Sequence, residues 1–247
     1  MTGGAGGLGS ATARRLVARR MAVCVFDVDP ARAAALAKEL GESAAYVGGD
    51  VANDADVSGA IGAAQSMGPL SLLVNVAGGG VGGGRTVGRD GSSHGRAAFT
   101  TTLEMNAVAT FNACRLVAAA MAENIPDDEG QRGVMVNTAS IAGYEGQIGQ
   151  LSYAAGKAAI LGMTLPMARD LAPLGIRVCA IAPGIVGTPA MERVSGQVKE
   201  HLLKGMVFPK RMGKPEEFAL LVEQVASNPY LNGENIRLDG GLRFAPK

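Results

Sequence analysis

Apolar runs alternate with amphipathic stretches along nearly the whole 247-residue chain, and this order constrains the fold more than any other feature. Runs of consecutive apolar residues indicate strands that are buried on both faces, as parallel sheets require. The runs predicted as strands are 22–27, 44–51, 72–77, 134–139, 178–182 and 236–239. The stretches predicted as helices are 11–20, 31–40, 57–67, 99–123, 153–171 and 215–226. Strict alternation predicts a single-domain α/β protein, residues 1–247, with a doubly wound parallel sheet.

The start of the chain departs from this order. A Gly-rich loop, Thr2-Gly3-Gly4-Ala5-Gly6-Gly7-Leu8-Gly9, precedes the first predicted helix, and no apolar run stands before it. A loop of this kind normally follows a strand, so we expect the sheet to lack its first, central strand. Each buried backbone group left unpaired beside such a gap costs about 1–3 kcal/mol. We therefore expect the chain to be less stable than one extended upstream by a hydrophobic strand.

Composition excludes several classes of partner. Lys and Arg total 23 against 22 Asp and Glu, and aromatic residues make up 4% of the chain, so no basic or base-stacking surface for nucleic acid is expected. Cys24, Cys114 and Cys179 are far apart in apolar segments, which favours buried reduced thiols and no metal site. With neither a signal peptide nor a run of about 18 apolar residues, we expect a soluble, cytoplasmic protein without membrane contact.

The Gly-rich loop opens directly into a helix, as loops that bind a pyrophosphate at a helix N-terminus do. A plain Gly-rich turn is the competing interpretation. Asp27, at the end of the next strand, favours a Rossmann-type dinucleotide site, because its carboxylate can bind both ribose hydroxyls of NAD and would repel the 2′-phosphate of NADP. Capping of the next helix is assigned to Asp29, before Pro30. Asp50-Val51 and Asn75–Gly78 end two further strands, so they should border the same crevice.

Tyr153 and Lys157 are four residues apart on one helical face, and Ser140 stands thirteen residues before the tyrosine. A tyrosine with an ordinary pKa near ~10 is a poor base at neutral pH. One ammonium at about 4 Å can supply the roughly 4 kcal/mol that lowers this pKa to about 7. We predict that Tyr153 exchanges the hydroxyl proton of a substrate, that Lys157 lowers the tyrosine pKa and holds ribose, and that Ser140 orients the substrate oxygen. A lone Tyr-x-x-x-Lys pair is usually structural, but a nucleotide loop and the serine in the same chain favour catalysis.

These motifs occur in the order typical of the short-chain dehydrogenase/reductase family, which the chain resembles from Thr2 to Gly241. The resemblance implies an NAD-dependent oxidoreductase acting on a secondary alcohol or ketone. It also implies that Asn106 completes a catalytic tetrad through a water to the lysine, and that Pro183, Gly184 and Thr188 lie against the nicotinamide. The predicted catalytic residues are Asn106, Ser140, Tyr153 and Lys157. The predicted cofactor-binding residues are Gly3, Gly7, Leu8, Gly9, Asp27, Asp50, Val51, Asn75, Ala77, Gly78, Tyr153, Lys157, Pro183, Gly184 and Thr188.

Within this family the chain is similar to the type II 3-hydroxyacyl-CoA dehydrogenases, also described as 17β-hydroxysteroid dehydrogenase type 10. The similarity rests on the stretches 130–133, 137–140, 143–150, 162–173, which contains Pro166, and 232–240. It implies oxidation of a 3-hydroxyacyl-CoA by NAD and assembly as a homotetramer. One departure is Gly156, which weakens its helix by about 1 kcal/mol against Ala.

The alternatives are a 3-oxoacyl-carrier-protein reductase, a hydroxysteroid dehydrogenase, and an inactive interaction protein with the same fold. Residues 185–211 are long for a connection between strand and helix, and we expect a substrate lid there. Its apolar residues either contact the acyl chain or form a plain amphipathic surface helix; they are Met191, Leu202, Leu203, Met206 and Phe208. Lys204, Lys210 and Arg211 could meet CoA phosphates, although solvated surface charge is the simpler interpretation.

Overall fold

The structure is a computed structural model that describes residues 1–81, 83–192, 203 and 205–246. Parallel strands form its centre, in agreement with the predicted fold class. The strands are β1 (Val23–Asp27), β2 (Ala44–Gly48), β3 (Leu72–Asn75), β4 (Gly133–Thr138), β5 (Ile176–Pro183) and β6 (Asn235–Leu238). β1 pairs with β2, and β3 to β6 pair in sequence order. No strand pairs with both β1 and β3 among the described residues, so a gap separates these two strands.

The gap between β1 and β3 is closed at one end by the first two residues. The carbonyl oxygen of Met1 accepts a hydrogen bond from Phe26 N at 2.9 Å. Thr2 N donates to Val74 O at 3.0 Å, and Val76 N donates to Thr2 O at 3.1 Å. Among the described residues the central position of the sheet is therefore held by these two residues alone, at the end where the strands meet the Gly-rich loop.

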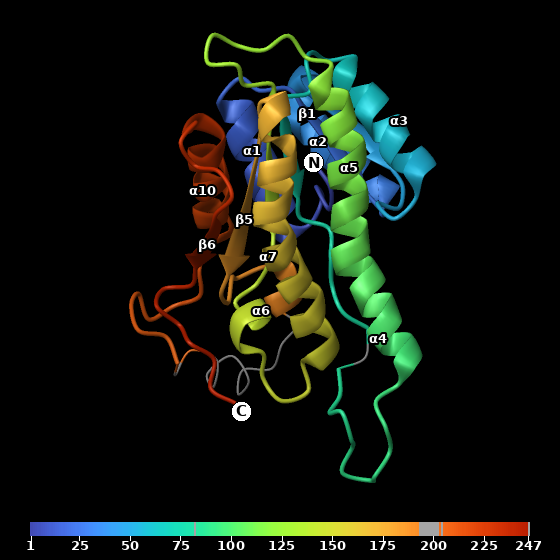
Figure 1. The fold of residues 1–247 in the computed structure, drawn as a ribbon, viewed down its shortest axis with the longest axis vertical. Helices are drawn as coiled ribbons and strands as arrows, with labels where there is room; N and C mark the ends of the chain where they lie inside the picture. The colour runs from blue at the N-terminus through green and yellow to red at the C-terminus, as the bar shows by residue number, and fades with distance from the viewer. Residues whose placement is uncertain (82, 193–202, 204, 247) are drawn as a thin grey trace.

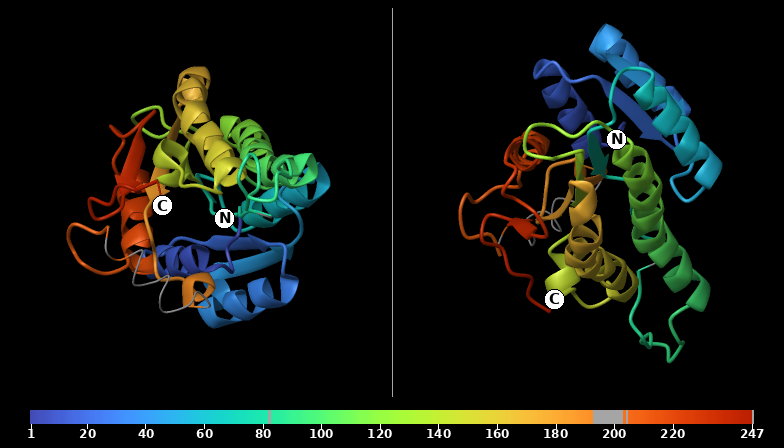
Figure 2. Two further views of the ribbon diagram at one scale, coloured as in Figure 1. Left: turned by 90° about the horizontal axis from the view of Figure 1, so that it is seen from below. Right: turned by 45° about the horizontal axis from the view of Figure 1, so that its top comes forward.

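Helices cover both faces of the sheet (Figures 1 and 2). One face carries α1 (Gly7–Ala18), α2 (Pro30–Leu40) and α10 (Pro215–Ser227), and the other carries α3 (Asp54–Gln65), α5 (Ala109–Ala122) and α7 (Leu151–Leu171). Short 3₁₀ turns, η1 (Gly41–Ser43) and η3 (Ala172–Leu174), precede β2 and β5. Capping explains one boundary: the Asp29 side chain accepts hydrogen bonds from Ala31 N and Arg32 N, and Pro30 begins α2.

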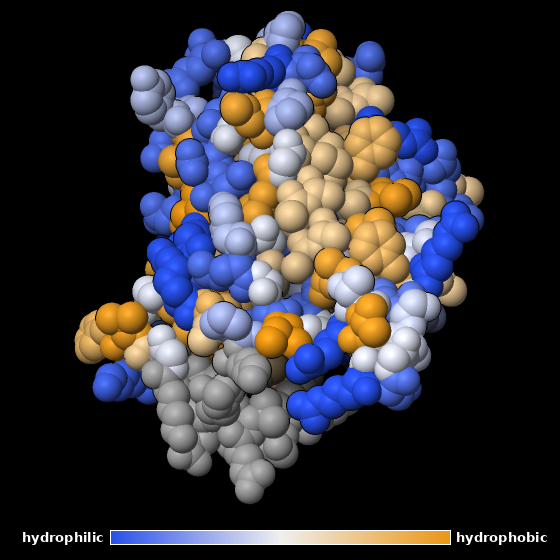
Figure 3. Space-filling view, turned by 60° about the horizontal axis from the view of Figure 1, so that its bottom comes forward, coloured by the Kyte–Doolittle hydropathy of each residue, from blue (hydrophilic) through white to orange (hydrophobic). Residues whose placement is uncertain are grey.

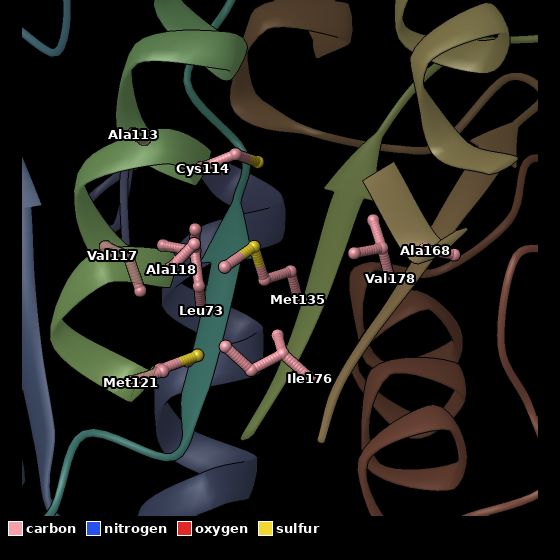
Figure 4. Packing of buried hydrophobic residues seen from close by; sticks show 10 residues of the cluster. All are labelled: Leu73, Ala113, Cys114, Val117, Ala118, Met121, Met135, Ala168, Ile176 and Val178. Atoms are coloured by element: carbon pink, nitrogen blue, oxygen red, sulfur yellow. The ribbon is translucent and has the colours of Figure 1, made fainter. Parts of the chain in front are cut away.

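The core consists of apolar layers on either side of the central strands. Figure 4 shows one such layer, where Leu73 and Met135 lie beside α5 and Val178 lies beside Ala168 of α7. All three cysteines are free and buried, as predicted. Burial raises the pKa of the Cys114 thiol to about 12, so this sulfur stays a neutral thiol, hydrogen-bonded to Asn75 and Asn137.

The long predicted helix at 99–123 is more complex in the structure. It consists of α4 (Arg96–Leu103), a π-helical turn η2 (Glu104–Val108) and α5. The continuous helix Arg96–Ala122 is long and apolar enough to cross a membrane, with a mean hydropathy of 1.2, but half of that window is buried in the fold, as in the core helix of a globular protein. Two short helices were not predicted, α6 (Ala142–Glu145) and α8 (Pro189–Glu192). Neither is long enough to show a helical period in the sequence.

Candidate active site

A cavity of about 790 Å³ opens at the carboxyl ends of β1, β2 and β3. This is the edge at which doubly wound sheets bind nucleotides. Of the predicted cofactor residues, those that line it are Gly3, Gly7, Leu8, Asp27, Asp50, Val51, Ala77, Gly78 and Thr188. The fold thus brings predicted residues from five separate segments of the chain to one cavity.

The Gly-rich loop fits a pyrophosphate because it has no room for side chains. Gly3 has φ +59°, and a Cβ there would lie 2.6 Å from Ala77 N. A Cβ on Gly7 would lie 2.9 Å from the Thr188 Cβ. Gly9 is buried behind the cavity, where a Cβ would collide with the Gly3 carbonyl oxygen. The loop therefore offers a bare backbone surface at the N-terminus of α1, as a phosphate site requires.

Asp27 stands at the end of β1 with its carboxylate beside the Gly-rich loop. Its Oδ2 accepts a hydrogen bond from Ala5 N at 2.9 Å, and its Oδ1 accepts one from Asp29 N at 3.1 Å. Sequence reasoning missed Arg32, which also lines the cavity and donates from Nη2 to Ala5 O at 2.6 Å. A carboxylate and a guanidinium therefore flank the same edge of the loop.

Asn75 is placed differently from the prediction. It is 2% exposed and lies beneath the cavity instead of lining it. Its Oδ1 accepts from Thr2 Oγ1 at 3.0 Å, and its Nδ2 donates to Asn137 Oδ1 at 2.9 Å. An amide buried between strands needs such partners, so Asn75 ties the Gly-rich loop to β3 and β4.

A second cavity, of about 340 Å³, contains the predicted catalytic residues Ser140, Tyr153 and Lys157. Ser140 follows β4, and the other two residues lie on the first turns of α7. Leu8, Val76, Gly78 and Thr188 line both cavities, which makes the two spaces neighbours. Pro183 and Gly184, at the end of β5, line the catalytic cavity, and their contact with the nicotinamide stays a prediction.

Lys157 is buried, and its Nζ donates to the Thr138 carbonyl oxygen at 2.8 Å. The same nitrogen lies 5.8 Å from the centre of the Tyr153 ring. Burial lowers the pKa of Lys157 to about 8, because the charged ammonium is removed from water. The side chain is therefore poised to titrate near the physiological range.

The pKa of Tyr153 runs against the prediction. We predicted that Lys157 lowers it, but in the structure burial of the phenol raises this pKa, and the hydrogen bond with Ser140 offsets only part of the rise. The physical reason is that desolvation disfavours the phenolate more than its neighbours stabilise it. In this state Tyr153 is a neutral phenol, which is a proton donor.

Asn106 lies in the π-helical turn η2 and is fully buried. Its Nδ2 donates to Gly79 O at 2.5 Å and to Thr102 O at 2.7 Å, and its Oδ1 accepts from Gly79 N at 3.3 Å. A Cβ on Gly78 would lie 2.8 Å from Asn106 Oδ1 and 3.3 Å from Lys157 Nζ. The structure thus brings Asn106 and Lys157 to the same glycine, Gly78. A π-helical turn such as η2 is frequently found at a functional site.

The predicted lid is described only in part, because residues 193–202 and 204 lie outside the described residues. Met191 lines the catalytic cavity, and Leu203 and Met206 belong to the apolar cluster below it. Phe208 is 80% exposed and takes no part in that cluster. Arg211 is paired with Glu217 at 2.6 Å, so it is engaged within the chain. Leu202 and Lys204 fall among the residues that are not described.

Among the residues that line the catalytic cavity and were missed from the sequence are three with large side chains: Gln147, Gln150 and Phe244. The two glutamines flank the loop before α7, and the Gln150 Oε1 accepts a hydrogen bond from Gln147 N at 3.1 Å. The motif 143–150 was used as a sign of resemblance, but nothing in its spacing placed these side chains at the cavity. Phe244, in the C-terminal tail, carries no motif at all.

Fold and site together define a dinucleotide-dependent enzyme, and comparison with known proteins gives its class. The family model for short chain dehydrogenases matches residues 1–199. The chain belongs to the short-chain dehydrogenase family, and it is an oxidoreductase acting on CH–OH groups.

At a finer level, the chain is 45% identical over 247 residues to human 3-hydroxyacyl-CoA dehydrogenase type-2, covering 100% of this chain and 95% of the human protein. The Drosophila melanogaster protein of the same name is also 45% identical, over 100% of this chain and 97% of its own length. The crystal structure of 3-hydroxyacyl-CoA dehydrogenase type-2 from Mycobacterium avium superposes with a TM-score of 0.97 at 47% identity, over 100% of this chain and 95% of that one. The 3-ketoacyl-(acyl-carrier-protein) reductase from Brucella melitensis, complexed with NADH, gives 0.84 at 27% identity, over 97% and 95%.

Proposed function

We propose that this chain catalyses the reversible oxidation of a 3-hydroxyacyl-CoA to the 3-oxoacyl-CoA with NAD. The observation that carries the proposal is the cavity that holds Ser140, Tyr153 and Lys157 directly beside the nucleotide cavity. The full-length similarity to proteins named 3-hydroxyacyl-CoA dehydrogenase type-2 supports the substrate class.

The residues of the catalytic cavity have separate roles in proton transfer and in stabilising the substrate oxygen. When bound, NAD would accept the hydride that leaves the carbinol carbon of the substrate. Tyr153 takes the hydroxyl proton in the oxidation and returns it to the ketone oxygen in the reduction. Ser140 donates a hydrogen bond to the same oxygen and so stabilises the charge that develops there. Because the pKa of Tyr153 is raised, the phenol is ready for the reductive direction.

Lys157 and Asn106 are buried residues that support the part of the cavity in which Tyr153 lies. The Lys157 ammonium is held by the Thr138 carbonyl, 5.8 Å from the centre of the Tyr153 ring, where it can bind a ribose hydroxyl of the cofactor. Asn106 fixes Gly79 and the backbone around it, next to Gly78 on the cavity wall. All four positions carry groups suited to catalysis, which argues against an inactive interaction protein.

We infer that the cofactor is NAD, because the Asp27 carboxylate stands at the edge of the loop where the adenosine ribose binds in such folds. A negative charge there repels a 2′-phosphate. Arg32 lies on the same edge and could attract one, but it is exposed and its guanidinium is bound to Ala5 O. The buried carboxylate, 9% exposed, is the less screened of the two charges.

We further propose that the chain forms a homo-oligomer, a tetramer by resemblance, through the face formed by α5 and α7. Apolar side chains gather in a band on one face of the molecule (Figure 3). Val108, Phe111 and Leu165 are 50%, 48% and 44% exposed on these helices and the adjoining η2. Exposed apolar patches of this kind mark contacts between proteins. We also propose that residues 185–211 close over the bound substrate.

The proposed function is tested by initial rates of NADH oxidation with acetoacetyl-CoA, with an acetoacetyl thioester of acyl carrier protein, and with an oxosteroid, each repeated with NADPH. We expect the highest kcat/KM with acetoacetyl-CoA and NADH. A preference for the carrier-protein thioester with NADPH would replace the proposal by a carrier-protein reductase. Turnover of the oxosteroid alone would replace it by a hydroxysteroid dehydrogenase.

A further inference from the structure

The C-terminal tail lies against the loop that leads into α7. Ile148 N donates to Pro246 O at 3.0 Å, and the Gln147 side-chain amide donates to Ala245 O at 3.2 Å. Figures 1 and 2 show the red C-terminal tail running beside α6. The tail is therefore bonded to the segment that carries Gln147 and Gln150 into the catalytic cavity.

A cluster of charges fixes the base of the tail. The Arg237 guanidinium pairs with Asp239 at 2.6 Å, donates to Leu242 O at 3.0 Å, and pairs with Glu145 of α6 at 2.5 Å. Arg243 also pairs with Asp239, at 3.0 Å. The Arg237 side chain is 22% exposed, so water screens these contacts less than those of a fully exposed pair. The charges join β6, α6 and the tail into one unit.

Phe244 is the side chain that the tail delivers to the catalytic cavity. It lines that cavity together with Ser140, Tyr153 and Met191. It also packs against the buried cluster formed by Ile141, Ile185, Met206 and Leu242. The aromatic ring of Phe244 thus forms an apolar wall of the cavity. Close packing of the cluster behind the ring leaves the ring little freedom to move.

We propose that the tail segment 242–246 is a wall of the substrate cavity and that Phe244 limits the length of acyl chain the enzyme accepts. The proposal rests on the proposed function, since it assigns the specificity of the same site. A ring packed against this cluster cannot yield to a long acyl chain, whereas a smaller side chain at this position would extend the cavity toward the cluster. Each additional methylene then buried improves binding about fourfold.

The test compares the wild type with Phe244→Ala and Phe244→Leu on a series of 3-oxoacyl-CoA substrates from acetoacetyl-CoA to 3-oxodecanoyl-CoA. We expect Phe244→Ala to raise the ratio of kcat/KM for the longest to the shortest substrate at least about tenfold, mainly through KM, with Leu intermediate. Tyr230→Ala is the matched control, because this aromatic residue is 97% exposed in the turn between α10 and β6. The Kd for NADH and the thermal midpoint are measured for each variant to exclude damage to the fold.

An unchanged ratio in a folded Phe244→Ala variant that still binds NADH would overturn the proposal, and so would a lower ratio, which would mean that the ring attracts long chains. Failure of the proposed function has a different signature, because the wild type itself would turn over no acyl-CoA in the series. The same ratio is then measured on methyl ketones of increasing length, where the wall should have the same effect.

Discussion

Lys157 is a lysine removed from water, since its ammonium is buried against the Thr138 carbonyl. Burial lowers its pKa from 10.5 in the unfolded chain to about 8 in the folded one. Below pH 8 both states hold the proton, and the folded state bears the full penalty of the buried charge. Between pH 8 and 10.5 the unfolded state binds more protons, so this residue makes the protein more stable as the pH rises.

We therefore expect the free energy of unfolding of the wild type to rise relative to Lys157→Met by about 2 kcal/mol between pH 7 and pH 9.5. Urea titrations of both proteins at several pH values measure this difference. Using the difference removes contributions from groups that titrate in both proteins, such as distant acidic and basic pairs. Parallel curves over this range would mean that the lysine keeps an ordinary pKa.

We propose that Asp27 controls the choice between NAD and NADP. Asp27→Asn keeps an acceptor for Ala5 N but removes the charge that repels a 2′-phosphate. A hydrogen bond to a charged group contributes about 1.5–3 kcal/mol, so we expect the ratio of kcat/KM for NADH to that for NADPH to fall about tenfold or more.

The double variant Asp27→Asn/Arg32→Ala separates the two charges at this edge of the loop. We expect it to lose the gain with NADPH, because Arg32 is the cation that lines the cavity beside Asp27. An unaltered ratio in both variants would show that the ribose binds elsewhere in the cavity.

At the residue scale, local spacing predicted the site well where the residues share one element or end neighbouring strands. Tyr153 and Lys157 needed only the helical period, and Asp27 needed only its place at the end of a strand. Arg32 and Phe244 could not be found in this way, because they reach the cavities from a helix and a tail with no fixed spacing to the motifs. Asn75 was placed at the right strand end, but the sequence does not reveal that its side chain faces Thr2 and Asn137.

At the element scale, the stability of the fold is limited most by the gap between β1 and β3 at the centre of the sheet. A groove of about 350 Å³ runs between β1 and β3 beyond Met1, and its walls include Leu16, Cys24, Leu72 and Val74. Strands on both sides of this groove present backbone groups that a further parallel strand could bond. The sheet is thus open at its middle beside Ala22 and Leu72, whereas Cys24 O and Phe26 N of β1 already bond to Met1.

A segment of about six residues rich in Val and Ile, fused ahead of Met1, is expected to raise the thermal midpoint by about 5 °C or more. The reason is that it pairs backbone groups on two strands, and 1 kcal/mol corresponds to about 2–4 °C for a protein of this size. Differential scanning calorimetry measures the shift, and a Gly/Ser segment of equal length is the control. Equal midpoints for the two fusions would show that the groove does not accept a strand.

At the element scale, the strands and the main helices were predicted because parallel strands buried on both faces leave uninterrupted apolar runs. The π-turn inside Arg96–Ala122 was not predicted, since one extra residue in a turn barely alters the apolar period. α6 was missed because four residues complete only about one helical turn. These short elements are set by tertiary contacts, such as the ion pair between Glu145 and Arg237.

For the whole molecule, we propose that the apolar face of α5 and α7 is the contact through which chains assemble. Phe111→Glu places a charge on that face, and we expect it to reduce the particle mass measured by light scattering during size-exclusion chromatography. Ile125→Glu is the matched control, because Ile125 is 93% exposed in the loop between α5 and β4. A wild-type mass equal to one chain would contradict the proposed oligomer, and an unchanged mass in Phe111→Glu would place the contact on another face.

The central claim is that the two neighbouring cavities form one active site in which Tyr153 transfers the proton of the substrate oxygen. NADH oxidation with acetoacetyl-CoA, measured for the wild type and Tyr153→Phe at equal cofactor saturation, tests it most directly. We expect turnover by the wild type and a loss of kcat of at least about 100-fold in the variant, with little change in the Kd for NADH. Equal kcat in the two proteins would contradict the account.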